Sequence, residues 1–213
     1  MLLTSEGIEN YISGVIFHEE TAKQSSTQGV NFCEYLKSKG IIPGIKVDKG
    51  LGELNNHHKE NYTKGLDALP AMAKEFYGLG CRFAKWRAVL KIEHGCPSEQ
   101  AILENAWGLA RYAAICQENG LVPIVEPEIL SDGTHSAEDC QRITERVLAA
   151  VFFALQKNHV LLEGCLLKPN MVTYGSEHPK KKENNLQEEA HRTVRALSRT
   201  VPAALVGITV LYI

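Results

Sequence analysis

The sequence has no long apolar run and no cysteine pair, and each absence argues against a class of protein. No segment approaches the roughly 18 consecutive apolar residues that indicate a membrane-spanning helix. The first residues include the acidic Glu6 and lack the apolar core of a signal or transit peptide. The cysteines form no Cys-x-x-Cys motif and are predicted to be reduced thiols of a cytoplasmic protein. They are Cys33, Cys81, Cys96, Cys116, Cys140 and Cys165.

An excess of charge of one sign is also missing. The chain carries 23 Lys and Arg against 25 Asp and Glu, a formal net charge of −2 with the two signs interspersed. Such a surface gives no field that attracts polyanions, so neither nucleic acid nor an acidic membrane surface is an expected partner. The length of 213 residues and the 44% share of hydrophobic residues fit one globular domain over residues 1–213.

Short apolar runs alternate with amphipathic segments along the chain. Strands are predicted at 12–17, 41–48, 83–90, 122–128, 162–168 and 204–211. Helices are predicted at 6–11, 32–37 and 67–77, from an N-cap at Ser98 to the Asn119–Gly120 stop, from Ser136 to 155, and at 186–197. Residues 51–63 show no period and are predicted to form a loop.

This alternation predicts successive parallel βα units, in a doubly wound sheet or in an arc of a (β/α)8 barrel. Two features favour the barrel. Gly50-Leu51-Gly52 lacks the third glycine of the dinucleotide-binding turn. Charged residues also recur two positions apart on the predicted strands, where both can face one lumen. We therefore predict an α/β fold with an incomplete barrel of about six consecutive βα units.

One lysine, Lys168, follows an apolar strand-like run and directly precedes Pro169. Proline cannot donate to a ladder, so the strand is predicted to end there, with Lys168 at its carboxyl end. Loss of hydration favours the neutral amine, which can attack a carbonyl carbon. The alternative is a lysine that extends to the rim and solvates the strand end.

Further charged residues lie on the neighbouring strands and could face the same pocket. They are Lys46 and Asp48, Lys85 and Arg87, and Glu126 and Glu128. A cation such as Lys85 would favour a neutral Lys168, and Glu126 is placed to act as general acid and base. Lys46 and Arg87 suit phosphate oxygens. The alternative is a structural layer of ion pairs, Lys46 with Asp48 and Arg87 with Glu128.

Five stretches carry a resemblance to a known family. They are Tyr-Ile-Ser-Gly-Val-Ile (11–16), Gly-Ile-Lys-Val-Asp-Lys-Gly (44–50), Phe-Ala-Lys-Trp-Arg (83–87), Pro-Ile-Val-Glu-Pro-Glu-Ile-Leu (123–130) and Leu-Glu-Gly-Cys-Leu-Leu-Lys-Pro-Asn-Met-Val (162–172). In this order they resemble the class I fructose-bisphosphate aldolases of the vertebrate glycolytic type. The resemblance implies a homotetramer that cleaves fructose 1,6-bisphosphate reversibly to dihydroxyacetone phosphate and glyceraldehyde 3-phosphate. It also implies that no metal or other cofactor is needed, because the protonated imine accepts the electrons.

By this resemblance Lys168 is the Schiff-base lysine, Glu126 the acid and base, and Lys85 a catalytic cation. We expect Lys46, Arg87, Asp48 and Glu128 to line the substrate site.

The chain also departs from the family. Family members carry a further strand before position 11, with an aspartate used in cleavage, and a phosphate loop and eighth strand after the last predicted strand. The chain by itself is therefore expected to show little cleavage activity. Alternatives are an impaired aldolase fragment or isoform, a non-catalytic interaction protein, or another Schiff-base barrel enzyme of the transaldolase kind.

Overall fold

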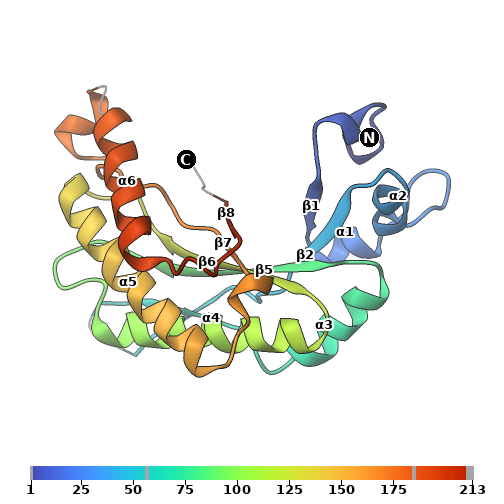
Figure 1. Cartoon of the computed structure of the whole chain (residues 1–213), viewed down its shortest axis with the longest axis horizontal. Coiled ribbons are helices and arrows are strands. Elements are labelled where there is room, and N and C mark those ends of the chain that lie inside the picture. Colours follow the sequence, from blue (N-terminus) through green and yellow to red (C-terminus); the bar gives the residue numbers. More distant parts are fainter. Residues whose placement is uncertain (1, 56–57, 184–185, 210–213) are drawn as a thin grey trace.

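The computed structural model describes residues 2–55, 58–183 and 186–209, and its centre is a parallel sheet of six strands. The strands are β1 (Gly14–Phe17), β2 (Ile42–Lys46), β5 (Phe83–Leu90), β6 (Val122–Ile129), β7 (Leu166–Leu167) and β8 (Gly207–Ile208). Their order in the sheet follows the chain, with β1 and β8 at the two edges (Figure 1). The predicted arc of about six parallel βα units is confirmed.

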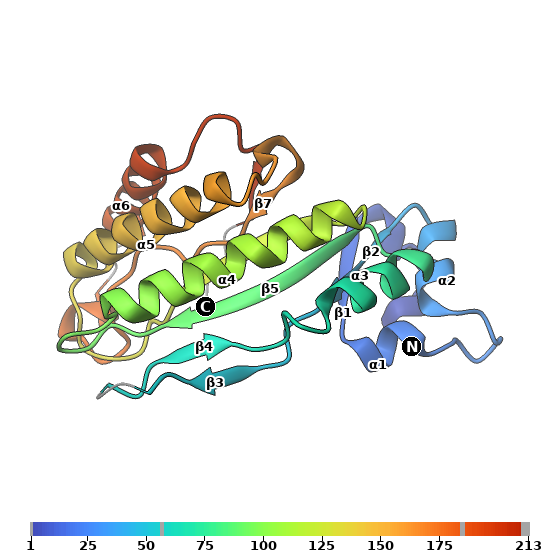
Figure 2. The ribbon, with the colours of Figure 1, turned by 90° about the horizontal axis from the view of Figure 1, so that it is seen from below.

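Helices cover the outer face of this sheet. They are α1 (Glu19–Lys23), α2 (Phe32–Ser38), α3 (Leu69–Gly78), α4 (Glu99–Glu118), α5 (Ala137–Lys157) and α6 (Leu186–Thr200). Single 3-10 turns occur at Leu2–Thr4, Ile8–Asn10, Leu162–Gly164 and Pro179–Lys182. Figure 2 shows α4 running along the length of β5, and α5 packs on α4 and β6. Among the described residues, no helix has the length and apolar character needed to cross a bilayer.

The two longest helices begin where their capping residues predict. The Ser98 hydroxyl accepts a hydrogen bond from the Ala101 backbone N–H at 3.1 Å, at the start of α4. At the start of α5, the Ser136 hydroxyl accepts from the Asp139 N–H at 3.0 Å and donates to the Asp139 carboxylate at 2.8 Å. These side chains satisfy backbone donors that have no partner within the helix.

Behind the central strands, one aromatic residue links β5 to β6. Tyr112 of α4 is fully buried, and its ring stacks on Trp86 with centroids 5.4 Å apart. Its hydroxyl lies 2.7 Å from the Ala84 carbonyl oxygen and 3.2 Å from that of Ile124. Burial raises the pKa of Tyr112 well above its usual range, so the hydroxyl stays protonated and can donate. This contact fixes α4 against two adjacent strands.

The predicted loop at 51–63 is wrong in part, because its ends pair as an antiparallel hairpin. Strand β3 (Leu51–Glu53) pairs with β4 (Asn61–Thr63), and residues 56 and 57 lie outside the described residues. Gly52 lies opposite Tyr62, where a Cβ atom would come within 2.6 Å of the ring. Side-chain periodicity cannot reveal such a hairpin, because only three residues on each side pair.

The predicted strand at 162–168 is much shorter than expected. Residues Leu162–Gly164 form a 3-10 turn, and only Leu166–Leu167 pair as a strand. The Gln117 side chain at the end of α4 accounts for the difference. It donates to the carbonyl oxygens of Leu161, at 2.8 Å, and Gly164, at 3.2 Å, and accepts from the Leu161 N–H at 3.0 Å. The predicted strand at 204–211 is likewise reduced to Gly207–Ile208, and residues 210 and 211 lie outside the described residues.

We expect Tyr112→Phe to lower the free energy of unfolding by about 1–3 kcal/mol, because two backbone carbonyls lose a donor in a dry environment. Chemical denaturation followed by circular dichroism measures the change. Tyr77→Phe is the control, since Tyr77 is 42% exposed and should change stability by less than about 0.5 kcal/mol. Equal effects of the two substitutions would contradict the role of the buried hydroxyl.

Candidate active site

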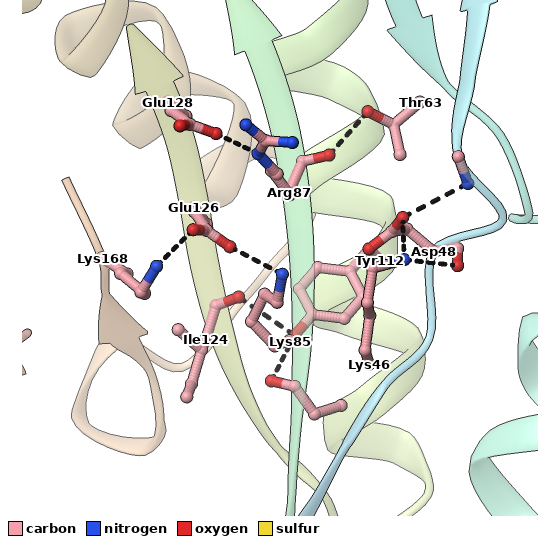
Figure 3. A network of polar contacts seen from close by, with 12 residues as sticks. Lys46, Asp48, Thr63, Lys85, Arg87, Tyr112, Ile124, Glu126, Glu128 and Lys168 are labelled. Carbon is pink, nitrogen blue, oxygen red and sulfur yellow. Dashed lines mark hydrogen bonds and ion pairs between the residues drawn. The ribbon is translucent and has the colours of Figure 1, made fainter. Parts of the chain in front are cut away.

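Adjacent parallel strands bring the predicted site residues together. Lys46 ends β2 and lies in register with Lys85 of β5, while Arg87 lies in register with Glu126 of β6. Lys168 directly follows β7, and its N–H donates to the Val125 carbonyl of β6 at 2.8 Å. Figure 3 shows these side chains directed toward one another from the neighbouring strands.

The Glu126 carboxylate lies between two lysines. Its Oε1 accepts a hydrogen bond from Lys168 Nζ, and its Oε2 lies 3.1 Å from Lys85 Nζ. The second contact is an ion pair without hydrogen-bond geometry, because Glu126 Oε2 has no hydrogen-bond partner among the described residues. The side chains of Lys85, Lys168 and Glu126 are 13%, 16% and 4% exposed. Two cations therefore share one carboxylate with little access to water (Figure 3).

Two further ion pairs flank this centre. Lys46 Nζ lies 2.7 Å from Asp48 Oδ1, and Arg87 donates from Nε to Glu128 Oε2. The hydrogen bond to Glu128 raises the pKa of Arg87 above its ordinary value. These are the two pairs of the structural alternative, and both form. The Arg87 side chain nevertheless remains 42% exposed, so water still reaches it.

The seven predicted side chains divide into three contact groups. Lys168 and Lys85 meet at Glu126, Lys46 meets Asp48, and Arg87 meets Glu128. Four cations and three carboxylates leave one positive charge in excess, which suits an anionic ligand. Within the described residues, no three His, Cys, Asp or Glu side chains are grouped so that they could hold a metal ion.

Two polar residues that the sequence analysis missed support this cluster. The Thr63 hydroxyl of the hairpin donates to the Arg87 carbonyl oxygen at 2.7 Å (Figure 3). Asn170, two residues after Lys168, accepts from the Ile129 N–H through its side-chain oxygen at 3.1 Å. The signal for Asn170 was its place directly after the strand-ending Lys168–Pro169. No comparable signal pointed to Thr63, because the hairpin itself was not predicted.

A cavity of about 640 Å³ lies elsewhere on the molecule. Its lining comes from the loop after β5, the loop after β6 and the start of α5, and includes His94, Ser136 and Arg146. None of the seven predicted site residues lines it. The concentration of buried charge, rather than the volume of a cavity, therefore identifies the candidate active site.

Comparison with known proteins gives a consistent family match. The family model described as fructose-bisphosphate aldolase class-I matches residues 1–212. Cytosolic fructose-bisphosphate aldolase 6 of Arabidopsis thaliana is 58% identical over 211 residues, which are 99% of this chain and 58% of that protein. Fructose-bisphosphate aldolase 1 of Toxoplasma gondii is 57% identical over 210 residues, 98% of this chain and 57% of that protein.

A solved structure gives the same result. The aldolase of Plasmodium falciparum, solved in complex with TRAP and a small-molecule inhibitor, superposes with a TM-score of 0.94 at 52% sequence identity. The match covers 98% of this chain and 60% of that one. The chain thus spans less than two thirds of the length of these relatives.

We expect Arg87→Met to lower the free energy of unfolding, because Glu128 is then left as a buried carboxylate without its cation. Water reaches Arg87, so the expected loss is about 2 kcal/mol, below the roughly 3–5 kcal/mol of a fully buried pair. The double variant Arg87→Met/Glu128→Leu should recover much of the loss, since neither charge remains. Urea denaturation of the wild type, Arg87→Met, Glu128→Leu and the double variant measures this cycle. If the stability losses of the two single variants simply add in the double variant, the result contradicts a coupled pair.

Proposed function

The chain belongs to the class I fructose-bisphosphate aldolase family, and from this premise we propose that Lys168 forms an imine with the ketone of a sugar phosphate. The observation that carries the proposal is the contact of Glu126 with both Lys168 and Lys85. It places one proton carrier in direct contact with both an amine and a second cation. Covalent catalysis by a lysine uses an amine and a proton carrier, and a nearby cation assists it.

During imine formation, protons can move between Lys168 and Glu126 through the hydrogen bond that joins them. The Lys168 ammonium first transfers one proton to Glu126, which leaves a neutral amine. The amine then bonds to the carbonyl carbon, and a proton moves from nitrogen to the former carbonyl oxygen to give a carbinolamine. Glu126 returns its proton to the departing hydroxyl, which leaves as water, and a protonated imine remains on Lys168.

Lys85 acts on this step through its charge. Its ammonium lies 3.1 Å from Glu126 Oε2 and is mostly buried, so the interaction is only weakly screened. Its positive charge offsets the negative charge of the Glu126 carboxylate that is restored when water has left. We therefore assign Lys85 as a catalytic cation, in direct contact with the acid and base.

Lys46 and Arg87 are proposed to bind the phosphate groups of the substrate. Arg87 uses Nε for Glu128, so the two Nη groups at the outer edge of its guanidinium can face a phosphate oxygen. Lys46 is held by Asp48 and is partly exposed. In this assignment Asp48 and Glu128 line the substrate site as well, because they fix the direction of the two cations.

The reaction that fits these groups is reversible cleavage of fructose 1,6-bisphosphate to dihydroxyacetone phosphate and glyceraldehyde 3-phosphate, as in glycolysis. The electron sink is the protonated imine, and the proposed step uses only protein side chains. The contacts of Glu126 with Lys168 and Lys85 concern imine formation, the first half of this reaction.

Several expectations stay predictions beside this proposal. An impaired aldolase or a non-catalytic interaction protein is the alternative, and a chain that traps no imine would favour it. A homotetramer, a cytoplasmic location and a single domain over residues 1–213 also remain predictions.

Borohydride reduction in the presence of dihydroxyacetone phosphate should add the mass of the reduced triose phosphate to the peptide that contains Lys168. The expectation follows from the place of Lys168 beside its proton carrier. Peptide mass spectrometry locates the adduct, and Lys168→Met should abolish it. An adduct on Lys85, with Lys168 unmodified, would overturn the assignment.

Glu126→Gln should slow imine formation by about 10²-fold, because the amide keeps the size of the side chain but cannot carry the proton. Rapid quenching with borohydride gives the single-turnover rate constant. Glu128→Gln tests the neighbouring carboxylate on the same strand. A larger loss in that variant, with Glu126→Gln near the wild-type rate, would assign the proton transfer to Glu128.

A further inference from the structure

The segment that carries Lys168 lies against β6 although its own strand is only two residues long. Strand β7 pairs Leu166 with Ile124 and Leu167 with Val125, and the Lys168 N–H donates to the Val125 carbonyl at 2.8 Å. In this parallel register the next ladder bond would run from the N–H of residue 127 to the Lys168 carbonyl. Residue 127 is proline and has no N–H, so this bond cannot form.

One side chain restores a contact beyond this interruption. In the same register the Pro127 carbonyl could accept from the Asn170 N–H, and the Ile129 N–H would then donate to the backbone carbonyl of residue 170. Instead, the Ile129 N–H donates to the side-chain oxygen of Asn170 at 3.1 Å. The segment is thus attached to β6 at Val125 on one side of Glu126 and at Ile129 on the other. The Lys168 amine meets the Glu126 carboxylate between these two attachments.

We propose that Asn170 is a positioning residue, whose hydrogen bond from Ile129 N–H holds the Lys168 backbone so that the Lys168 amine meets Glu126. Asn170 acts through Lys168 and needs no contact with the substrate. The inference rests on the proposed function, since it concerns the lysine assigned there to imine formation. Displacement of a reacting group by about 1 Å can cost about 10²-fold in rate, so a single anchoring bond can matter for the reaction.

Two substitutions of Asn170 distinguish the effect of its hydrogen-bond acceptor from the effect of its side-chain size. Asn170→Leu keeps a similar volume and removes the acceptor, whereas Asn170→Asp keeps an oxygen that can accept from Ile129 N–H. Asn158→Leu is the matched control. Asn158 lies at the end of α5, where its side chain donates to the Ala154 carbonyl at 2.9 Å, and it is not one of the site residues.

The rate constant and the concentration dependence of imine formation with dihydroxyacetone phosphate are measured for each variant by borohydride quenching. We expect Asn170→Leu to lower the rate constant by about 10²-fold with little change in half-saturating concentration. Asn170→Asp should recover most of the rate, and Asn158→Leu should keep it. A wild-type rate constant in Asn170→Leu, or an equal loss in Asn158→Leu at equal thermal stability, would overturn the positioning role.

A second measurement does not depend on imine chemistry. Acetic anhydride labels accessible amines, and mass spectrometry gives the labelling rate of Lys168 relative to the exposed Lys157. Loss of the Asn170 anchor should raise this ratio severalfold, because the amine is released from Glu126. Failure of the wild-type chain to trap any imine would refute the proposed function, while an unchanged labelling ratio in Asn170→Leu would refute the positioning role on its own.

Discussion

The contact of one buried carboxylate with two ammonium groups is the constraint on which the rest of the site depends. A carboxylate removed from water is costly unless cations and hydrogen bonds compensate for its lost hydration. Glu126 meets this requirement only if β5, β6 and the segment after β7 keep their relative register. A slip of one residue would turn Glu126 to the opposite face of the sheet and leave Lys85 and Lys168 as adjacent unpaired cations. The long pairing of β5 with β6, from Phe83 to Leu90, therefore supports chemistry as well as stability.

The two readings of the charged strands, catalytic site and structural ion pairs, describe the same arrangement. Lys46 and Arg87 each have a carboxylate partner, as the structural reading requires. Yet both remain partly exposed, and the seven groups together keep an excess positive charge. Paired carboxylates can hold cations in fixed directions before a ligand arrives, which lowers the entropy lost on binding. The same residues can therefore form ion pairs and also bind a ligand.

Much of the fold and of the site was predictable from local patterns. Capping serines at 98 and 136 fixed the starts of the two long helices, and charges two residues apart on strands indicated a shared face. The features that escaped prediction depend on partners distant in sequence. Gln117 bends residues 161–164 away from a strand, and the hairpin at 51–63 depends on the close approach of Gly52 and Tyr62. The hydrogen bond of Asn170 with the Ile129 N–H likewise joins residues 41 positions apart in the chain.

The agreement between strand order and chain order has a consequence for how the protein is made. Each strand of the sheet from β2 to β8 pairs with the sheet strand that precedes it in the chain. During synthesis the sheet can therefore grow at a single edge, with each new βα unit docking on residues already translated. Lys46, Lys85, Arg87 and Glu126 are all translated before the ribosome reaches Lys168. The lysine assigned to the covalent step is thus the last of the seven site residues to be translated.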